Sequence, residues 1–283
     1  MSNIYLGCAI WGYRPWVGDW LPAGTSANDM LRAYGQRLTT VEINATFYAV
    51  PDAATVARWA ADTPDGFRFC PKVPKAISHG GALARQTGAT REFIGRMQGL
   101  GAKLGPIFLQ LPPGYGPGQL ADLSAWLEAW PAEAELAVEV RHPGWFGGPA
   151  GRELNRRLEA RGAGRVVVDV RPVNTGATSD PVILEARGKK PDVPVELDYT
   201  GSTVLLRFMG HPDLAIDRPI LAEWAGQAGA WLAEGKTVYV FMHCPVEERS
   251  PELCALFAEQ MAGLGAPIAL PEPELPPEQL TLF

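Results

Sequence analysis

The chain has 283 residues, of which 47% are hydrophobic and 20% are charged, enough for one large core or for two domains. Its net charge of -6 and isoelectric point of about 5.3 argue against non-specific binding of nucleic acids or anionic membranes through bulk charge. No apolar run approaches the roughly 20 residues that a membrane-spanning helix needs.

The amino-terminal segment and the cysteines predict a cytoplasmic protein. Residues 1–7 lead almost at once into an apolar run and lack the basic and long apolar regions of a signal peptide. The four cysteines show no C-x-x-C spacing, which favours reduced thiols.

Apolar runs typical of strands alternate with helical patterns along most of the chain. Strands are predicted at residues 4–10, 40–44, 67–72, 106–111, 136–141, 165–171, 203–209 and 237–242. Helices are predicted at residues 28–38, 53–61, 90–104, 119–130, 152–161, 219–234 and 251–264. Residues 172–199 are the least regular part, where only a partial helix is expected.

Repeated βα units with about eight strands predict an α/β fold, specifically a single (β/α)8 barrel of the TIM type over residues 1–264. A doubly wound open sheet is the alternative, but no G-x-G-x-x-G lies between the first strand and its helix. Residues 265–283 are rich in proline, which predicts an extended linker followed by a terminal interaction peptide.

Five predicted strands end in charged or hydrogen-bonding residues. A charge at the end of a buried strand is costly if it is unpaired, so such residues belong where strands open onto a cleft. In a barrel this is the carboxyl end of the strands, which predicts a shared polar site. The side chains concerned are Glu42, Asn44, Glu139, Arg141, His142, Asp169, Arg171, Arg207, His211 and His243.

All four histidines follow or extend a predicted strand. Barrel enzymes gather catalytic groups at this rim, so proton transfer or metal ligation is the functional interpretation. Packing of single histidines in loops is the alternative. The residues are His79, His142, His211 and His243.

Three strand ends carry a carboxylate two residues before a polar partner, so that each pair shares one face of its strand. The pairs are Glu42 with Asn44, Glu139 with Arg141, and Asp169 with Arg171. Acid–base chemistry or metal binding is one interpretation of these carboxylates, and a structural ion pair in the barrel mouth is the other.

Two classes of ligand fit the predicted mouth. Carboxylates and histidines on separate strands are usual ligands of a divalent metal, and such a site leaves no local motif. They are Glu42, Glu139, Asp169, His211 and His243. Basic side chains favour an anionic substrate such as a phosphate or a carboxylate instead. They are Lys72, Arg141, Arg171 and Arg207.

The tryptophans fall into two groups. Those within helical patterns are expected in the core, namely Trp59, Trp126, Trp130, Trp224 and Trp231. Those in predicted βα loops either stack on a planar ligand or cap the top of the barrel. They are Trp11, Trp16, Trp20 and Trp145.

Four ordered blocks resemble the YecE-like family, also called domain of unknown function seventy-two. The blocks are residues 41–48 (VEINATFY), 67–72 (FRFCPK) with His79, 109–113 (LQLPP) and 138–145 (VEVRHPGW). The similarity extends from about residue 6 to residue 254. It implies a barrel of the (β/α)8 type with a polar pocket at the strand ends, and it implies no particular reaction.

The last five residues, Gln279-Leu280-Thr281-Leu282-Phe283, are similar to the peptide with which bacterial replication and repair proteins bind the sliding clamp. In such a peptide Leu282 and Phe283 would fill an apolar pocket while Gln279 forms hydrogen bonds at its edge. Packing of Leu280, Leu282 and Phe283 on the barrel is the alternative.

These patterns predict a barrel enzyme that acts on a small or locally anionic substrate, with hydrolysis of a phosphodiester or nucleotide as the sharpest version. The predicted catalytic residues are Glu42, Glu139, His142, Asp169, His211 and His243. The predicted substrate-binding residues are Trp11, Asn44, Tyr48, Lys72, His79, Gln110, Arg141, Trp145 and Arg207. A non-catalytic adaptor recruited to the clamp is the alternative, and a structural ion-pair plug without a ligand is a third interpretation.

Overall fold

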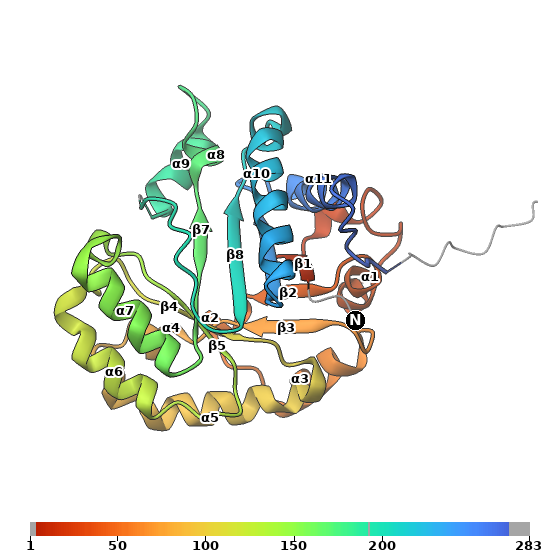
Figure 1. The fold of residues 1–283 in the computed structure, drawn as a ribbon. Coiled ribbons are helices and arrows are strands. Elements are labelled where there is room, and N and C mark those ends of the chain that lie inside the picture. The colour runs from red at the N-terminus through yellow and green to blue at the C-terminus, as the bar shows by residue number, and fades with distance from the viewer. Residues whose placement is uncertain (1–3, 192, 272–283) are drawn as a thin grey trace, which may run out of the picture.

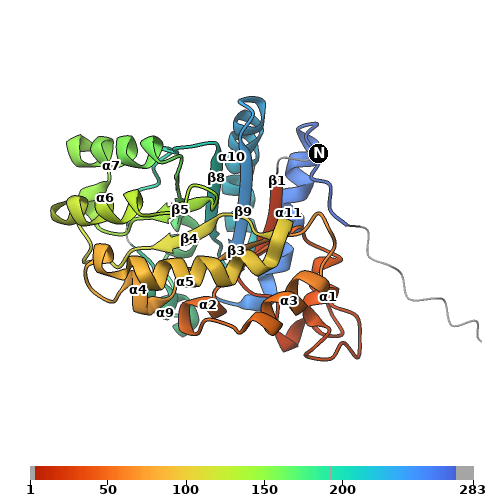
Figure 2. The same cartoon turned by 90° about the horizontal axis from the view of Figure 1, so that it is seen from below.

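A computed structural model describes residues 4–191 and 193–271 of the chain, in which helices surround parallel strands (Figure 1 and Figure 2). The strands are β1 (Ile4–Cys8), β2 (Thr40–Ile43), β3 (Arg68–Pro71), β4 (Ile107–Gln110), β5 (Leu136–Glu139), β6 (Gly164–Arg165), β7 (Val167–Asp169), β8 (Thr203–Met209) and β9 (Thr237–His243).

The helices follow the strands in alternation. They are α1 (Met30–Gly35), α2 (Ala45–Tyr48), α3 (Ala53–Ala61), α4 (Lys75–Ser78), α5 (Thr87–Met97), α6 (Leu120–Glu128), α7 (Gly148–Ala160), α8 (Arg171–Asn174), α9 (Pro181–Lys189), α10 (Leu214–Ala233) and α11 (Ser250–Gly263). Short 3-10 helices are η1 (Arg14–Trp16), η2 (Leu83–Gln86), η3 (Gln98–Lys103), η4 (Pro117–Gln119), η5 (Pro143–Trp145) and η6 (Glu247–Arg249).

The described strands form two parallel sheets, one in the order β3-β2-β1-β9-β8-β7 and one in the order β4-β5-β6. Isolated bridges from Phe69 to Leu104 and from Lys72 to Phe108 link the two sheets on one side. On the other side the chain changes partner at Val166, since β6 pairs with β5 and β7 pairs with β8. The predicted α/β architecture is confirmed, but the sheet is not closed, so a complete barrel is not.

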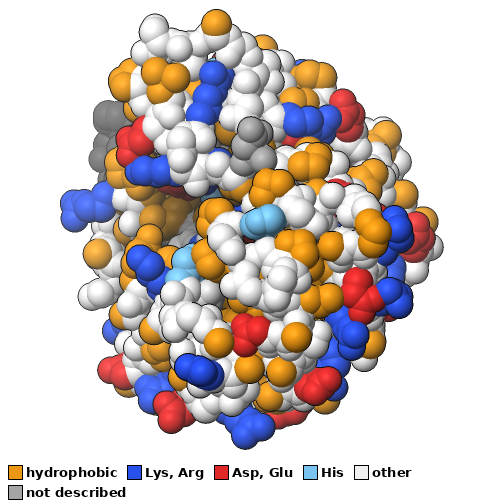
Figure 3. Space-filling view, turned by 90° about the vertical axis from the view of Figure 1, so that its left-hand side faces the viewer, with side chains coloured by type: hydrophobic (Ala, Val, Ile, Leu, Met, Phe, Trp, Pro, Cys, Tyr) orange, Lys and Arg blue, Asp and Glu red, His pale blue; other side chains and the backbone are white. Residues whose placement is uncertain are grey.

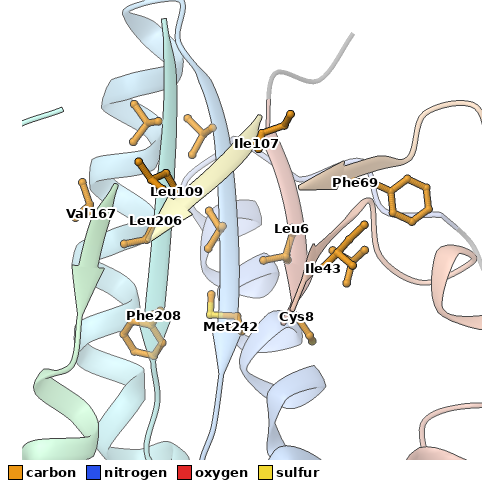
Figure 4. Packing of buried hydrophobic residues seen from close by; sticks show 14 of the residues in the cluster. Leu6, Cys8, Ile43, Phe69, Ile107, Leu109, Val167, Leu206, Phe208 and Met242 are labelled. Carbon is orange, nitrogen blue, oxygen red and sulfur yellow. The ribbon is translucent and has the colours of Figure 1, made fainter. Parts of the chain in front are cut away.

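Alternate residues of a strand face opposite sides of the sheet. In β8, Leu206 and Phe208 pack in the layer between strands and helices, together with Met242 of β9 (Figure 4). Leu205 and Met209 belong instead to a second buried cluster, formed with residues of β3, β4, β5, β7 and β9. Arg207 has the same parity as this second set, so its side chain is on the inner face.

Helices α8 and α9 cover the second cluster at the carboxyl end of the strands, which is uppermost for β7 and β8 in Figure 1. Val173 of α8 packs on this cluster, as do Ile183 and Ala186 of α9. The sequence predicted at most a partial helix here, because the apolar residues of this segment are few. Their burial against the strand ends explains why two short helices form.

Most predicted elements are present within a few residues of their expected bounds. Helix α10 is the clearest difference, because it begins at Leu214 rather than near Pro219. The side chain of Asp213 accepts a hydrogen bond from the backbone amide of Ala215 and caps the helix six residues before the proline. Pro219 therefore lies inside the helix instead of starting it.

Beyond α11 the chain still packs on the core, since Ile268 is only 8% exposed and Leu270 contacts the same cluster. The predicted boundary at residue 264 and the terminal peptide stay predictions, because Gln279, Leu280, Leu282 and Phe283 lie outside the described residues. Among residues 4–191 and 193–271, no helix has the length and apolar character of a membrane span.

Candidate functional site

Polar side chains from six parallel strands meet at the carboxyl ends of those strands, and we call this group the strand-end cluster. Parallel strands bring their carboxyl ends to one edge, which gathers residues that are far apart in the sequence. The cluster consists of Glu42, Asn44, Lys72, Gln110, Glu139, Arg141, Arg207 and His243. The sequence predicted all eight as site residues.

Arg207 lies at the centre of the cluster and binds both carboxylates. Its Nε and Nη2 donate to Oε2 and Oε1 of Glu42 at 2.7 and 2.9 Å. Its Nη1 donates to Oε2 of Glu139 at 2.6 Å. Because none of the three residues is more than 3% exposed, water does not screen these ion pairs.

The two carboxylates accept further hydrogen bonds from neighbouring side chains. Oε1 of Glu139 accepts from Nε of Arg141 at 2.5 Å and from Nε2 of Gln110 at 2.9 Å. Oε1 of Glu42 accepts from Nδ2 of Asn44 at 3.0 Å. Each carboxylate oxygen is thus held in a fixed direction by at least one donor.

The pKa values of the two carboxyl groups follow from these contacts. Burial by itself raises the pKa of Glu139, but Arg141 and Arg207 overcome this and hold it at about 2. Burial also opposes ionisation of Glu42, while Arg207 and His243 hold its pKa well below the usual range. Both carboxylates are therefore ionised near neutral pH and poorly suited to accept a proton.

Two lysines add positive charge to the same region. Burial, followed by repulsion from Arg207, lowers the pKa of Lys72 to about 8. Lys190 follows α9, and burial together with Arg207 and Arg141 lowers its pKa to about 8 as well. The sequence predicted Lys72 but missed Lys190, because only the packing of α9 over the strand ends brings Lys190 close.

A histidine and a further carboxyl group complete the titratable set. Nε2 of His243 lies 3.4 Å from Oε2 of Glu42, and burial lowers the pKa of His243 to about 4. Burial raises the pKa of Glu247 to about 7, and Lys190 and Glu42 are among the charges that act on it. Glu247 was not predicted from the sequence, although its position shortly after β9, at the start of η6, was a usable signal.

Asp169 is fully buried but is not part of the strand-end cluster. Trp224 of α10 donates from Nε1 to its Oδ2 at 2.7 Å, and the guanidinium of Arg171 binds the same oxygen at 2.8 Å. Asp169 therefore faces the helix layer, on the opposite side of β7 from Val168. Asp169 and Arg171 contact each other, but they do so on the outer face of the sheet and not in the mouth.

Three of the four predicted histidines lie apart from the cluster. Nδ1 of His142 accepts from the amide of Gly144, and Nδ1 of His211 accepts from the amide of Asp213. His79 contacts the ring of Phe47 and lines a pocket of about 380 Å³. The ring of Phe47, which His79 contacts, lies 4.4 Å from Nζ of Lys72.

The aromatic residues that were predicted to bind substrate lie in two different environments. Trp11 and Tyr48 line a pocket of about 380 Å³ next to Asn44, and Tyr48 is 82% exposed. Trp145 is 0% exposed and donates from Nε1 to the carbonyl of Tyr115 at 2.7 Å. Burial leaves Trp145 no free face for a ligand, so we remove it from the substrate-binding set.

The five tryptophans predicted for the core are all buried. Their exposed fractions do not exceed 8%. They are Trp59, Trp126, Trp130, Trp224 and Trp231.

Among residues 4–191 and 193–271, no three His, Cys, Asp or Glu side chains come together in a way that would hold a metal ion. Glu42 and Glu139 instead face Arg207. Figure 3 shows the side of the molecule that is at the left of Figure 1, where hydrophobic side chains line a hollow with basic and histidine side chains near its edge.

Comparisons with known proteins identify the family of this fold. Residues 5–279 match the family model described as "Protein of unknown function DUF72". The UPF0759 protein YecE of Escherichia coli K12 is 36% identical over 274 residues, which cover 95% of this chain and 98% of that protein. The UPF0759 protein YunF of Bacillus subtilis is 24% identical over 196 residues, which cover 65% of this chain and 66% of that protein.

Solved structures show the same fold. A DUF72 family protein from Enterococcus faecalis has a TM-score of 0.68 at 19% identity, with 96% of this chain and 99% of that chain covered. A DUF72 family protein from Thermotoga maritima has a TM-score of 0.63 at 21% identity, with 92% and 98% covered. At these identities the likeness establishes the fold alone.

Proposed function

We propose a function for the strand-end cluster of this chain, which belongs to the DUF72 family of proteins of unknown function. The cluster binds a small anionic molecule and transfers protons to and from it, so that the protein acts as an enzyme on a barrel-type scaffold. The excess of buried positive charge supports this proposal most directly. Four cationic side chains, those of Lys72, Arg141, Lys190 and Arg207, act around two ionised carboxylates.

Uncompensated charge in a buried site is costly, and a bound anion is the simplest source of compensation. Glu42 and Glu139 neutralise Arg207 and Arg141, which leaves the two lysines without a described carboxylate ion pair. An anion beside Lys190 would raise the pKa of Lys190. Lys190 thus serves as the anion-binding group, and the carboxylates position the guanidinium groups of Arg207 and Arg141.

Groups other than the two paired carboxylates would carry the proton transfer. General acids and bases work best when their pKa lies near the operating pH. Glu247, with a pKa of about 7, and the two lysines, with pKa values of about 8, meet this condition. We therefore assign proton transfer to these side chains, and we revise the predicted acid–base role of Glu42 and Glu139.

A pair of adjacent lysines offers a matched test of anion binding. Lys190 is half-buried at the cluster, whereas Lys189 is exposed and pairs with Glu185. We expect Lys190→Met to weaken binding of inorganic phosphate roughly tenfold, since one charge-assisted hydrogen bond contributes about 1.5 kcal/mol. Lys189→Met should leave binding unchanged in the same calorimetric titration. Absence of binding of both phosphate and oxalate by the wild-type chain would refute the proposal.

Hydrolysis of a phosphodiester or nucleotide is the sharper form of the proposal. Turnover of bis(4-nitrophenyl) phosphate and of nucleotides, with and without Mg²⁺ or Mn²⁺, tests it directly. Hydrolysis that falls at least tenfold in Glu247→Gln would support it. Phosphate binding without any turnover would favour the alternative, a ligand-binding or adaptor module.

We also propose that Gln279, Leu280, Leu282 and Phe283 bind a bacterial sliding clamp. The resemblance of these residues to a clamp-binding peptide and the proline-rich segment before them support this proposal. Residues 269–271 line a pocket together with Ile4 and Phe67, at the amino end of the strands. The test compares clamp binding by the full chain, by Phe283→Ala and by a chain ending at Pro277. Equal binding by all three would contradict the proposal.

A further inference from the structure

We infer that the side-chain amine of Lys72 is a nucleophile that forms an imine with a carbonyl group of the anionic substrate. This inference rests on the proposed anion site and narrows its substrate class to carbonyl compounds that carry a phosphate or a carboxylate. The position, the surroundings and the missing partners of the Lys72 amine support it.

The backbone of Lys72 is fixed where the two sheets meet. Its amide donates to the carbonyl of Ile43 at 3.3 Å, and its carbonyl accepts from Oγ1 of Thr46 at 2.7 Å. A bridge pairs Lys72 with Phe108 of the second sheet. A catalytic side chain is held best by such an element, so the amine starts from a defined position at the carboxyl end of β3.

The amine itself has few partners. Nζ of Lys72 lies 3.4 Å from Oδ1 of Asn44, a long hydrogen bond, and 4.4 Å from the ring centre of Phe47. Among the described residues, no carboxylate forms an ion pair with it, although Lys72 is only 7% exposed. The nearby carboxylates are already engaged by the arginines.

Lys103 shows what a structural lysine looks like in the same molecule. Its Nζ donates to the carbonyls of Ala60 and Thr63 at 2.6 and 2.5 Å and also lies 3.9 Å from a carboxylate oxygen of Asp65. This partly buried ammonium, which supports the fold, thus has several acceptors. Lys72 lacks them, which indicates a group kept available for a ligand.

The surroundings of Lys72 increase the fraction of neutral amine. Nζ of Lys72 lies 5.6 Å from the ring centre of Phe108, and the guanidinium of Arg207 lies 4.9 Å from the same ring. Burial, followed by repulsion from Arg207, lowers the pKa of Lys72 to about 8. A free amine is the nucleophilic form of lysine, and a neighbouring cation is a known way to obtain it.

The covalent step conserves atoms and electrons without an oxidant. The lone pair of Nζ forms a bond to the carbonyl carbon, and the π electrons of the C=O bond move to oxygen. That oxygen takes up a proton and the nitrogen loses one, which gives a carbinolamine. A second proton lets the hydroxyl leave as water while the nitrogen lone pair forms the C=N bond. The neutral amine, the carbonyl compound and one proton thus give an iminium ion and water.

Reductive trapping tests this step. The full chain is incubated with pyruvate, with dihydroxyacetone phosphate or with uncharged acetone in the presence of sodium cyanoborohydride, and adducts are located by peptide mass spectrometry. We expect adducts with the two anionic carbonyl compounds at Lys72 and at least tenfold less with acetone. Lys72→Arg should abolish the adduct, and Lys75→Arg, a change at an exposed lysine of α4, should preserve it.

Each result separates the imine from the anion site. An adduct at Lys72 whose rate rises with pH through about 8 supports the inference. Adducts spread over several lysines, or centred on Lys190, overturn it. If no adduct forms while phosphate binding is lost in Lys190→Met, the imine is wrong but the proposed anion site stands. If neither adduct nor phosphate binding is found, both are wrong.

Discussion

Two buried carboxylates at strand ends form ion pairs of different kinds. Glu139 with Arg207 faces the inner side of the sheet, and Asp169 with Arg171 faces the helix layer. The outer carboxylate is enclosed by Trp224 and Arg171. The inner one is surrounded by more cations than it can neutralise.

The difference shows that a carboxylate and an arginine two residues apart do not by themselves identify a site. Glu139 with Arg141 and Asp169 with Arg171 both have this spacing. The two sites differ in their surplus of positive charge, since Arg171 is shared between Asp169 and Glu223. The inner cluster retains the lysines, whose charge is left for a ligand.

Replacement of Arg207 should have the largest effect on the free energy of unfolding. Arg207→Met leaves Glu42 and Glu139 buried without their main partner, so we expect a loss of about 3–5 kcal/mol in the free energy of unfolding. Urea unfolding followed by circular dichroism measures it. Arg207→Lys should recover only part of the loss, because an ammonium cannot bind both carboxylates as the guanidinium fork does.

The next largest effect should be a dependence of stability on pH that comes from the ionisation of Glu139. The pKa of Glu139 is about 2 in the folded chain and about 4.3 in an unfolded one, so its contribution is present above pH 4.3 and is lost as the pH falls towards 2. We expect a loss of roughly 2–3 kcal/mol over this window. In Glu139→Gln this part of the pH dependence should disappear. An unchanged pH profile in that variant would show that Glu139 is not the titrating group.

Loss of the ion pair between Asp169 and Arg171 should destabilise the fold less. Arg171 is 43% exposed, and Asp169 keeps the hydrogen bonds from Trp224 and from the backbone amide of residue 171. We expect Arg171→Met to cost about 1 kcal/mol in the free energy of unfolding and to leave phosphate binding unchanged. A loss as large as that of Arg207→Met would break the comparison between the two pairs.

The smallest effect is expected at the pocket beside Asn44. Tyr48 is 82% exposed, so Tyr48→Ala should change the free energy of unfolding by less than about 0.5 kcal/mol. If this pocket receives part of the ligand, the same variant should still weaken binding of an aromatic phosphate relative to inorganic phosphate. Equal weakening of both would show that Tyr48 does not contact the ligand.

The sequence by itself determined the alternation of strands and helices and the polar residues at the strand ends. Strand β8 and helix α3 have the predicted bounds because their apolar periods are strong. Seven residues of the strand-end cluster were predicted from their positions, since the carboxyl ends of parallel strands meet wherever the sheet lies. Gln110 was predicted from the family resemblance.

Only the tertiary structure decided which polar ends meet and which chemistry they favour. Asp169 was predicted for the site, but its side chain faces the helix layer. The face of β7 that is turned inward is decided by the tertiary packing of Val168 and Val170. Lys190 and Glu247 were missed, because loop packing brings them to the cluster. The sheet changes partner at Val166 rather than closing, which no local pattern indicates. Local apolar periods determine which segments form helices and strands. The side of the sheet that a residue faces, the closure of the sheet and the surplus of positive charge at the cluster depend on contacts between segments far apart in the chain.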